Sequence, residues 1–87
     1  MANLLTDKVV LVTGAGRGIG RAIAIAMAAE GAKVALTGRN MGRLKKVMEE
    51  IQLAGGESAT WRMDVSREVQ VSESIGKILE LWDHIDI

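Results

Sequence analysis

Glycines are concentrated in one short stretch of the sequence, VTGAGRGIG at residues 12–20, which follows an apolar run and precedes an alanine-rich one. A glycine-rich turn that leads from a strand into a helix exposes backbone N–H groups at the positive helix end, where they bind phosphate. Glycine also lacks a Cβ, so the backbone can approach a pyrophosphate closely. Four glycines within seven residues at such a place favour a phosphate-binding loop over a tight turn that happens to be glycine-rich.

The spacing of these glycines excludes two common phosphate loops. The dinucleotide pattern G-x-G-x-x-G requires a glycine in sixth position. Here the sixth residue is Ile19, Arg21 or Ile23, depending on which glycine begins the pattern. The pattern G-x-x-x-x-G-K-[ST] requires a lysine followed by serine or threonine, and the sequence contains no such pair.

Arginines lie close to the predicted starts of two helices. In NAD-binding units an Asp or Glu about twenty residues past the glycines binds the ribose 2′-hydroxyl, but the segment TGRN at residues 37–40 has no acid. A guanidinium at Arg39 can instead pair with a 2′-phosphate, with Arg17 as a second phosphate partner. A cation at a helix start is disfavoured by about 0.3–1 kcal/mol, which favours an anionic ligand over solvated surface arginines. We therefore expect NADP(H) to be preferred over NAD(H), and we interpret Arg21 as a solvated helix residue.

Two further polar residues, Asn40 and Asp64, are candidates both for a structural cap and for contact with a ligand. For each residue the two roles are compatible. Asn40 is a good N-cap for the helix that follows it, and it neighbours the expected ribose or phosphate. Asp64 is expected to cap the third helix or a turn, and Ser66 is a second candidate cap of the third helix.

Groups that could carry out catalysis are scarce. The sequence has no Tyr, no Phe and no Cys, and His84 is its only histidine. A mechanism that uses a phenol as proton donor has no candidate here, and disulfides and thiolate metal sites are excluded. We interpret His84 as a surface residue and Trp61 and Trp82 as packing anchors. No catalytic residue and no metal ligand is therefore expected in this chain.

Charge and hydropathy limit the kinds of binding partner that are expected. Eleven basic residues balance eleven acidic ones, so nothing favours a nucleic-acid partner. The longest uncharged apolar run, AIAIAMAA at residues 22–29, is far shorter than a membrane span. The N-terminus lacks the pattern of a signal peptide. We expect a cytoplasmic protein that binds neither nucleic acid nor membrane.

Strands and helices are predicted to alternate. The predicted strands span residues 8–12, 33–37 and 58–63, and the predicted helices span residues 18–30, 41–54 and 67–82. This order implies an α/β fold with a parallel sheet and right-handed crossovers, and the more polar third strand is expected nearer an edge. Residues 84–87, HIDI, begin another apolar run. We therefore expect residues 1–87 to be the N-terminal half of one doubly wound Rossmann domain, with a truncated fourth strand and the remainder absent.

Apolar spacing predicts the buried face of each helix. In the first helix the candidates recur every fourth residue, at Ile19, Ile23 and Met27. For the second helix they are Leu44, Val47, Met48 and Ile51, and for the third they are Val71, Ile75, Ile78, Leu79 and Trp82.

The spacing Thr13-Gly14-x-x-x-Gly18-x-Gly20 resembles the T-G-x-x-x-G-x-G signature of the short-chain dehydrogenase/reductase family. The longer stretch VTGAGRGIGRAIA is similar to that of its 3-oxoacyl-(acyl carrier protein) reductase-like members. GAKVALTGRN resembles the family's second strand and cofactor-selecting turn, MDVSRE its adenine-contacting turn, and HIDI the start of its fourth strand. The resemblance covers the whole chain.

This resemblance implies the cofactor-binding part of an NADP(H)-dependent reductase, which transfers hydride between NADP(H) and a carbonyl or alcohol substrate. The expected cofactor-binding residues are Gly14, Gly16, Arg17, Gly18, Ile19, Gly20, Arg39, Asn40, Asp64 and Val65. The family's catalytic Ser, Tyr-x-x-x-Lys pair and Asn have no counterpart in this chain, and its members imply a dimeric or tetrameric parent protein. The alternatives are a non-enzymatic nucleotide-binding or interaction module complete at residue 87, and another Rossmann-type enzyme such as a methyltransferase. The missing acid after the second strand disfavours the methyltransferase.

Overall fold

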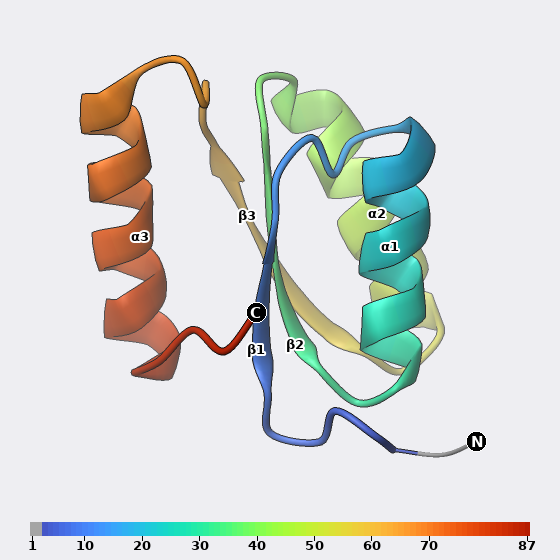
Figure 1. The fold of residues 1–87 in the computed structure, drawn as a ribbon. Coiled ribbons are helices and arrows are strands. Elements are labelled where there is room, and N and C mark those ends of the chain that lie inside the picture. Colours follow the sequence, from blue (N-terminus) through green and yellow to red (C-terminus); the bar gives the residue numbers. More distant parts are fainter. Residues whose placement is uncertain (1–2) are drawn as a thin grey trace.

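Three strands and three helices alternate along the chain (Figure 1), of which the computed structural model describes residues 3–87. The elements are β1 (Val9–Val12), α1 (Gly18–Ala29), β2 (Lys33–Gly38), α2 (Met41–Leu53), β3 (Glu57–Arg62) and α3 (Glu68–Trp82). The predicted order is confirmed, and each element begins and ends within one residue of its predicted boundary.

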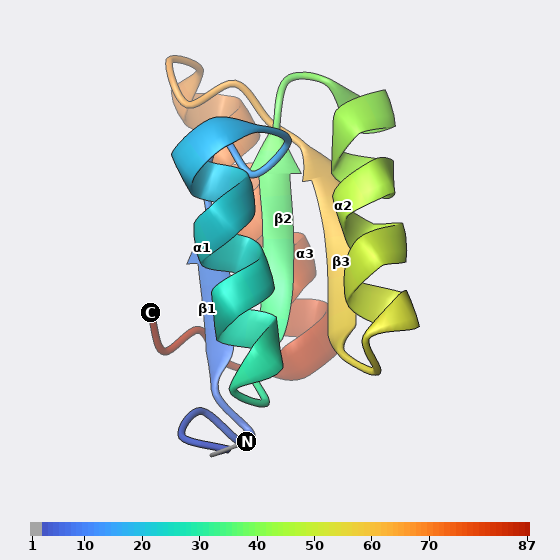
Figure 2. The ribbon, with the colours of Figure 1, turned by 90° about the vertical axis from the view of Figure 1, so that its right-hand side faces the viewer.

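The three strands form one parallel sheet in the order β1-β2-β3. In the central strand of the three, Val34 lies opposite Val10 on one side and Ser58 on the other. Helices α1 and α2 cover one face of the sheet and α3 covers the other (Figures 1 and 2). This is the predicted Rossmann-type arrangement, with the polar strand β3 at an edge. Because the strands are parallel, their carboxyl ends and the starts of all three helices lie at the same edge of the sheet.

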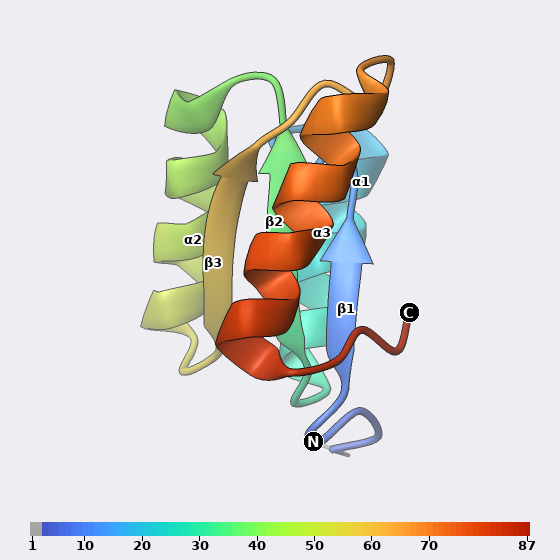
Figure 3. The same cartoon turned by 90° about the vertical axis from the view of Figure 1, so that its left-hand side faces the viewer.

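The C-terminal residues extend the sheet on the other side of β1 (Figure 3). The backbone N–H of Leu11 donates to the carbonyl oxygen of Ile87 at 2.8 Å, and that of Asp86 donates to Val9 at 2.8 Å. The Asp86 carboxylate in turn accepts a hydrogen bond from the Val9 N–H at 2.8 Å. The predicted fourth strand therefore begins beside the first, although residues 84–87 do not form a regular strand.

Residues of β1 and β2 are buried on both faces of the sheet, as their continuous apolar runs predict, whereas no residue of β3 is fully buried. Val10 and Val34 pack into the cluster formed with α1 and α2, whereas Val9 and Ala35 pack against α3. The predicted buried face of α2 is confirmed: Leu44, Val47 and Ile51 are buried and Met48 is partly buried.

The predicted buried face of α1 is wrong. Ile19 is 80% exposed and Ile23 is 41% exposed, and Met27 is only partly buried. The buried side chains of α1 are those of Ala24 and Ala28, with Ile25 and Met27 packed partly buried beside them. Small side chains let this helix lie close to the sheet, so the largest apolar residues do not mark its inner face.

Helix α3 differs from its prediction at Leu79, which is 40% exposed. The buried residues are Ser74, Ile78 and Trp82, spaced four apart, with Val71 and Ile75 partly buried. The small Ser74 side chain serves the same purpose as the alanines of α1, since it allows close packing on the sheet.

The two tryptophans pack against each other beside this face of the sheet, which agrees with their interpretation as packing anchors. The rings of Trp61 and Trp82 meet edge to face, with centroids 6.0 Å apart and planes at 78°. The indole N–H of Trp82 donates to the Glu57 carboxylate at 3.1 Å, which satisfies the one polar group of this largely buried ring.

Candidate nucleotide-binding site

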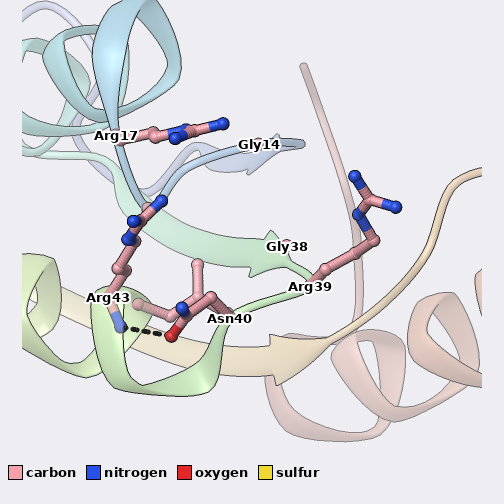
Figure 4. A pocket seen from close by; sticks show the side chains of 8 residues that line it. Gly14, Arg17, Gly38, Arg39, Asn40 and Arg43 are labelled. Atoms are coloured by element: carbon pink, nitrogen blue, oxygen red, sulfur yellow. Dashed lines mark hydrogen bonds between the residues drawn. The ribbon is translucent and has the colours of Figure 1, made fainter.

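Two adjoining hollows lie at the carboxyl ends of the strands. The first, of about 300 Å³, lies between the glycine loop, the end of β2 and the first turn of α2 (Figure 4). It is lined by Gly14, Gly16, Arg17, Gly38, Arg39, Asn40, Arg43 and Leu44. The second, of about 360 Å³, shares Gly14, Gly38 and Arg39 with the first and extends to residues 63–66. Together they form a groove across the sheet edge where ligands bind in open parallel sheets.

Glycine is needed in the loop for two different reasons, a left-handed backbone conformation at some positions and close backbone packing at another. Gly14 and Gly18 have φ angles of +61° and +60°, which glycine adopts readily and other residues rarely do. Apart from the adjoining backbone, no atom lies within 4 Å of the position that a Cβ would take at either residue, so the space beside each is open. At Gly20 the opposite holds, because a Cβ there would lie 2.1 Å from the carbonyl oxygen of Gly14. Only glycine at residue 20 lets the first turn of α1 pack directly on the loop.

Hydrogen bonds to β2 fix the loop in place. The Ala15 N–H donates to the carbonyl oxygen of Thr37 at 3.0 Å. The buried Thr37 hydroxyl donates to the carbonyl oxygen of Val12 at 2.7 Å. The first part of the loop, residues 12–15, is thus tied to the strand whose carboxyl end lines the first hollow.

Three arginines border the first hollow. Arg17 is the N-cap residue of α1, Arg39 lies in the turn after β2, and Arg43 lies in the first turn of α2. Neither helix has an acidic residue in its first turn. Among residues 3–87 none of the three forms an ion pair, whereas Arg21 pairs with Glu50 at 2.6 Å on the exposed side of α1 and α2. The hollow is therefore a positively charged site built on two helix starts, which is an arrangement that binds phosphate.

The predicted helix cap at Asn40 is confirmed. Its Oδ1 accepts a hydrogen bond from the Arg43 N–H at 3.1 Å (Figure 4). This bond satisfies one of the free N–H groups at the start of α2 and holds the first turn of the helix at the rim of the hollow. Arg43 itself was not predicted as a site residue. The signal that singled out Arg17 and Arg39, a cation at a helix start, applies to it equally.

Asp64 and Ser66 do not cap α3, contrary to the prediction. The N-cap residue of that helix is Arg67, which makes no side-chain capping bond. The Asp64 carboxylate instead closes a turn, accepting the Ser66 N–H at 3.0 Å and the Ser66 hydroxyl at 2.7 Å. The turn interpretation of Asp64 is therefore confirmed. These two bonds, chiefly the one from the hydroxyl, lower the pKa of the Asp64 carboxyl, with a smaller contribution from Arg39 and Arg67.

The groove brings most of the predicted cofactor residues together. Asp64 and Val65 line the second hollow, beside the Arg39 that it shares with the first. Gly18, Ile19 and Gly20 lie in the first turn of α1, outside the lining of either hollow. Arginines and loop backbone make up much of the lining, and Asp64, its one acid, is held in a turn by Ser66, so the site is suited to binding and orienting a nucleotide.

Residues 3–87 contain no group of three or more potential metal ligands. Over the same residues no helix is long and apolar enough to cross a membrane.

The sequence profile of the short chain dehydrogenase family matches residues 8–87. The chain belongs to this family. A curated relative, the 3beta-hydroxysteroid dehydrogenase of Mediterraneibacter gnavus, is 41% identical over 81 residues, which are 93% of this chain and 29% of that protein.

Solved structures similar to this chain include the following two. A metagenomic short-chain oxidoreductase in complex with NADP has 38% identity and a TM-score of 0.91, covering 94% of this chain and 37% of the other. A 3-ketoacyl-ACP reductase of Sinorhizobium meliloti has 41% identity and a TM-score of 0.86, covering 90% of this chain and 31% of the other. The chain spans about a third of the length of the curated relatives it matches.

Proposed function

We propose that this chain is the NADP(H)-binding half of a short-chain dehydrogenase/reductase that transfers hydride between NADP(H) and a carbonyl or alcohol substrate. The observation that carries the proposal is the arginine-lined hollow beside the glycine loop, at a strand end that has no carboxylate. Its open loop and its positive charge fit a phosphorylated dinucleotide. A similar short-chain oxidoreductase was solved in complex with NADP, which supports the same cofactor here.

Each part of the groove has a role in holding the cofactor. The backbone of the glycine loop, including Gly14 and Gly18, binds the pyrophosphate through its N–H groups and the positive end of α1. Arg39 and Arg17 pair with the 2′-phosphate, and Asp64 and Val65 contact the adenine. The bound cofactor supplies the hydride, while these residues orient it.

The proposal assigns the proton-transfer chemistry to residues outside this chain. Residues 1–87 form the N-terminal half of a single Rossmann domain, and the catalytic Ser, Tyr, Lys and Asn belong to its remainder. The relatives with named activities are dehydrogenases and reductases, which favours this function over a non-enzymatic binding module. A cytoplasmic location stays a prediction from the sequence, and a homo-oligomeric parent protein stays a prediction from the family resemblance.

The substrate class is a secondary alcohol or ketone, such as a 3-oxoacyl thioester or a sugar. The glycine-loop sequence and one similar structure, a 3-ketoacyl-ACP reductase, support the thioester. A similarly close relative is a hydroxysteroid dehydrogenase, so identity in this half of the fold does not select between these substrates.

The test measures the binding of NADPH and NADH to the natural full-length protein, and the oxidation of each by a panel of ketones and 3-oxoacyl thioesters. We expect tighter binding of NADPH, oxidation of NADPH that depends on a carbonyl substrate, and a reduced NADPH preference in Arg39→Ala. An unchanged NADPH-to-NADH preference in Arg39→Ala would refute the assignment of Arg39. A protein that binds the cofactor but reduces none of the carbonyls would favour the non-enzymatic module.

A further inference from the structure

Arg43 extends into the first hollow from the side opposite Arg39. In Figure 4 its side chain runs from the first turn of α2 toward Arg17, while the Arg39 guanidinium lies on the far side of the turn after β2. Arg39 also lines the second hollow together with Asp64, whose pKa it helps to lower. The first hollow is therefore lined by Arg17 and Arg43, and by a third arginine, Arg39, that it shares with the second hollow.

Backbone packing fixes Arg43 against the glycine loop. A Cβ added to Gly16 would lie 2.9 Å from the Cβ of Arg43, so the loop backbone and the first turn of α2 are in direct contact there. The Asn40 cap holds the N–H of Arg43 on the same turn. The start of the Arg43 side chain is thus positioned by both the loop and the helix cap, and only its outer part is free to adjust to a ligand.

Electrostatics leave the Arg43 guanidinium without a counter-charge. It stands in the first turn of a helix, where the macrodipole disfavours a cation, and that turn has no acidic residue. Within residues 3–87 no carboxylate pairs with it, although Glu50 on the same helix pairs with Arg21. A phosphate dianion in the hollow would supply the missing charge and accept hydrogen bonds from a planar guanidinium.

We infer that Arg43 is a specificity-determining residue of this protein, which holds the 2′-phosphate of NADP(H) together with Arg17, opposite Arg39. The inference rests on the proposed function, because it assigns a further residue to the same cofactor site. Arg43 distinguishes the two cofactors since the 2′-phosphate is the only group by which NADP(H) differs from NAD(H).

The experiment measures the dissociation constants of NADPH and NADH for the natural full-length protein and for Arg43→Ala, Arg43→Gln and Lys45→Ala. Lys45→Ala is the matched control, because this exposed cation lies on the same helix and lines neither hollow. We expect Arg43→Ala and Arg43→Gln to weaken NADPH binding about ten- to a hundredfold, as for the loss of a hydrogen bond to a charged group. In the two Arg43 variants the dissociation constant of NADH should change less than about twofold, and in Lys45→Ala the same should hold for both cofactors.

The outcomes separate this inference from the proposed function. If the unmodified protein prefers NADPH but Arg43→Ala weakens the binding of both cofactors equally, or of neither, the role assigned to Arg43 is refuted. The proposed cofactor then still stands. If the unmodified protein binds both cofactors equally, the NADP(H) assignment itself is wrong. Circular dichroism checks the fold of each variant, and Arg43→Gln, which keeps the side chain's length and polarity, decides the question if Arg43→Ala does not fold.

Discussion

The carbonyl oxygen of Gly14 occupies the space that a side chain on Gly20 would need. A Cβ added at residue 20 would lie 2.1 Å from that oxygen and 2.7 Å from its carbon. Both atoms belong to the backbone, so no side-chain rotation can relieve the overlap. This contact sets the distance between the glycine loop and α1, and with it the shape of the proposed pyrophosphate site.

The first prediction is that Gly20→Ala disrupts the loop. We expect the free energy of unfolding to fall by about 3 kcal/mol, the upper end of what overpacking costs, and cofactor binding to be lost. Chemical denaturation and cofactor titration of the full-length protein measure the two effects. Gly76→Ala is the control, since apart from the chain neighbours and the backbone of α3 itself no atom lies within 4 Å of the added Cβ. That variant should gain up to about 1 kcal/mol in helix propensity, and equal losses in both variants would contradict the clash.

The second prediction concerns the pKa of Asp64. The Ser66 hydroxyl, which donates to Asp64 at 2.7 Å, is the largest cause that lowers this pKa. We therefore expect Ser66→Ala to raise the pKa of the Asp64 carboxyl toward its ordinary value of about 3.9, as followed by NMR titration of the carboxyl carbon. Thr in place of Ser66 retains the hydroxyl and should keep the pKa low. If the pKa does not change in Ser66→Ala, the hydrogen bond seen here is not its cause.

The lowered pKa also fixes the sign of a pH effect. A carboxyl whose pKa is lower in the folded than in the unfolded state adds stability above the unfolded pKa of about 3.9, and this stability is lost as pH falls through the folded pKa. Comparison of the unfolding free energies of the natural protein and Asp64→Asn should therefore show a gap at neutral pH that narrows below about pH 4. A gap that widens on acidification would mean that the folded-state pKa is raised.

The sequence predicted the elements and the glycine loop well because their signals are local. Strand runs, the Asn40 cap and the glycine spacing depend on neighbouring residues, and all three agree with the structure. The buried face of α1 was missed because Ala24 and Ala28, rather than Ile19 and Ile23, are buried. Which face of α1 is buried depends on how closely the helix approaches the sheet, and the sizes of its side chains alone do not predict that distance.

The candidate site was predicted less completely than the fold. Arg43 reaches the hollow only because α2 packs against Gly16, a contact between segments more than twenty residues apart. The structural role of Asp64 likewise became clear only from the structure. From the sequence, its carboxylate could either close a turn with Ser66 or cap the following helix, and it closes the turn. Long-range packing and the choice between local hydrogen bonds are what the sequence leaves open.

The third prediction is that Arg21 does not belong to the cofactor site. It pairs with Glu50 between two exposed side chains, and such pairs contribute about 0–1 kcal/mol. Arg21→Ala should therefore lower the free energy of unfolding by less than about 1 kcal/mol and leave NADPH affinity unchanged. Thermal melting and cofactor titration test both parts, with Glu50→Gln as the matched variant. A tenfold loss of NADPH affinity in Arg21→Ala alone would place this arginine in the site.

The fourth prediction is that Asp83→Gly stabilises the protein. Asp83 ends α3 with a φ of +70°, and its N–H donates to the carbonyl oxygen of Leu79 at 2.8 Å. A left-handed residue after a helix is most often glycine, because any Cβ is strained there. We expect Asp83→Gly to raise the free energy of unfolding by about 0.5–1 kcal/mol and Asp83→Val to lower it by about 1–2 kcal/mol.

Glu80→Gly is the control for this pair, because residue 80 lies within α3. Glycine there should cost about 1 kcal/mol through lost helix propensity. Urea unfolding of the three variants tests whether the sign of a glycine substitution follows the backbone angle, as the strain argument requires. If Asp83→Gly and Glu80→Gly lower the stability by equal amounts, Asp83 carries no strain, and its side chain must stabilise the end of the helix by local hydrogen bonds instead.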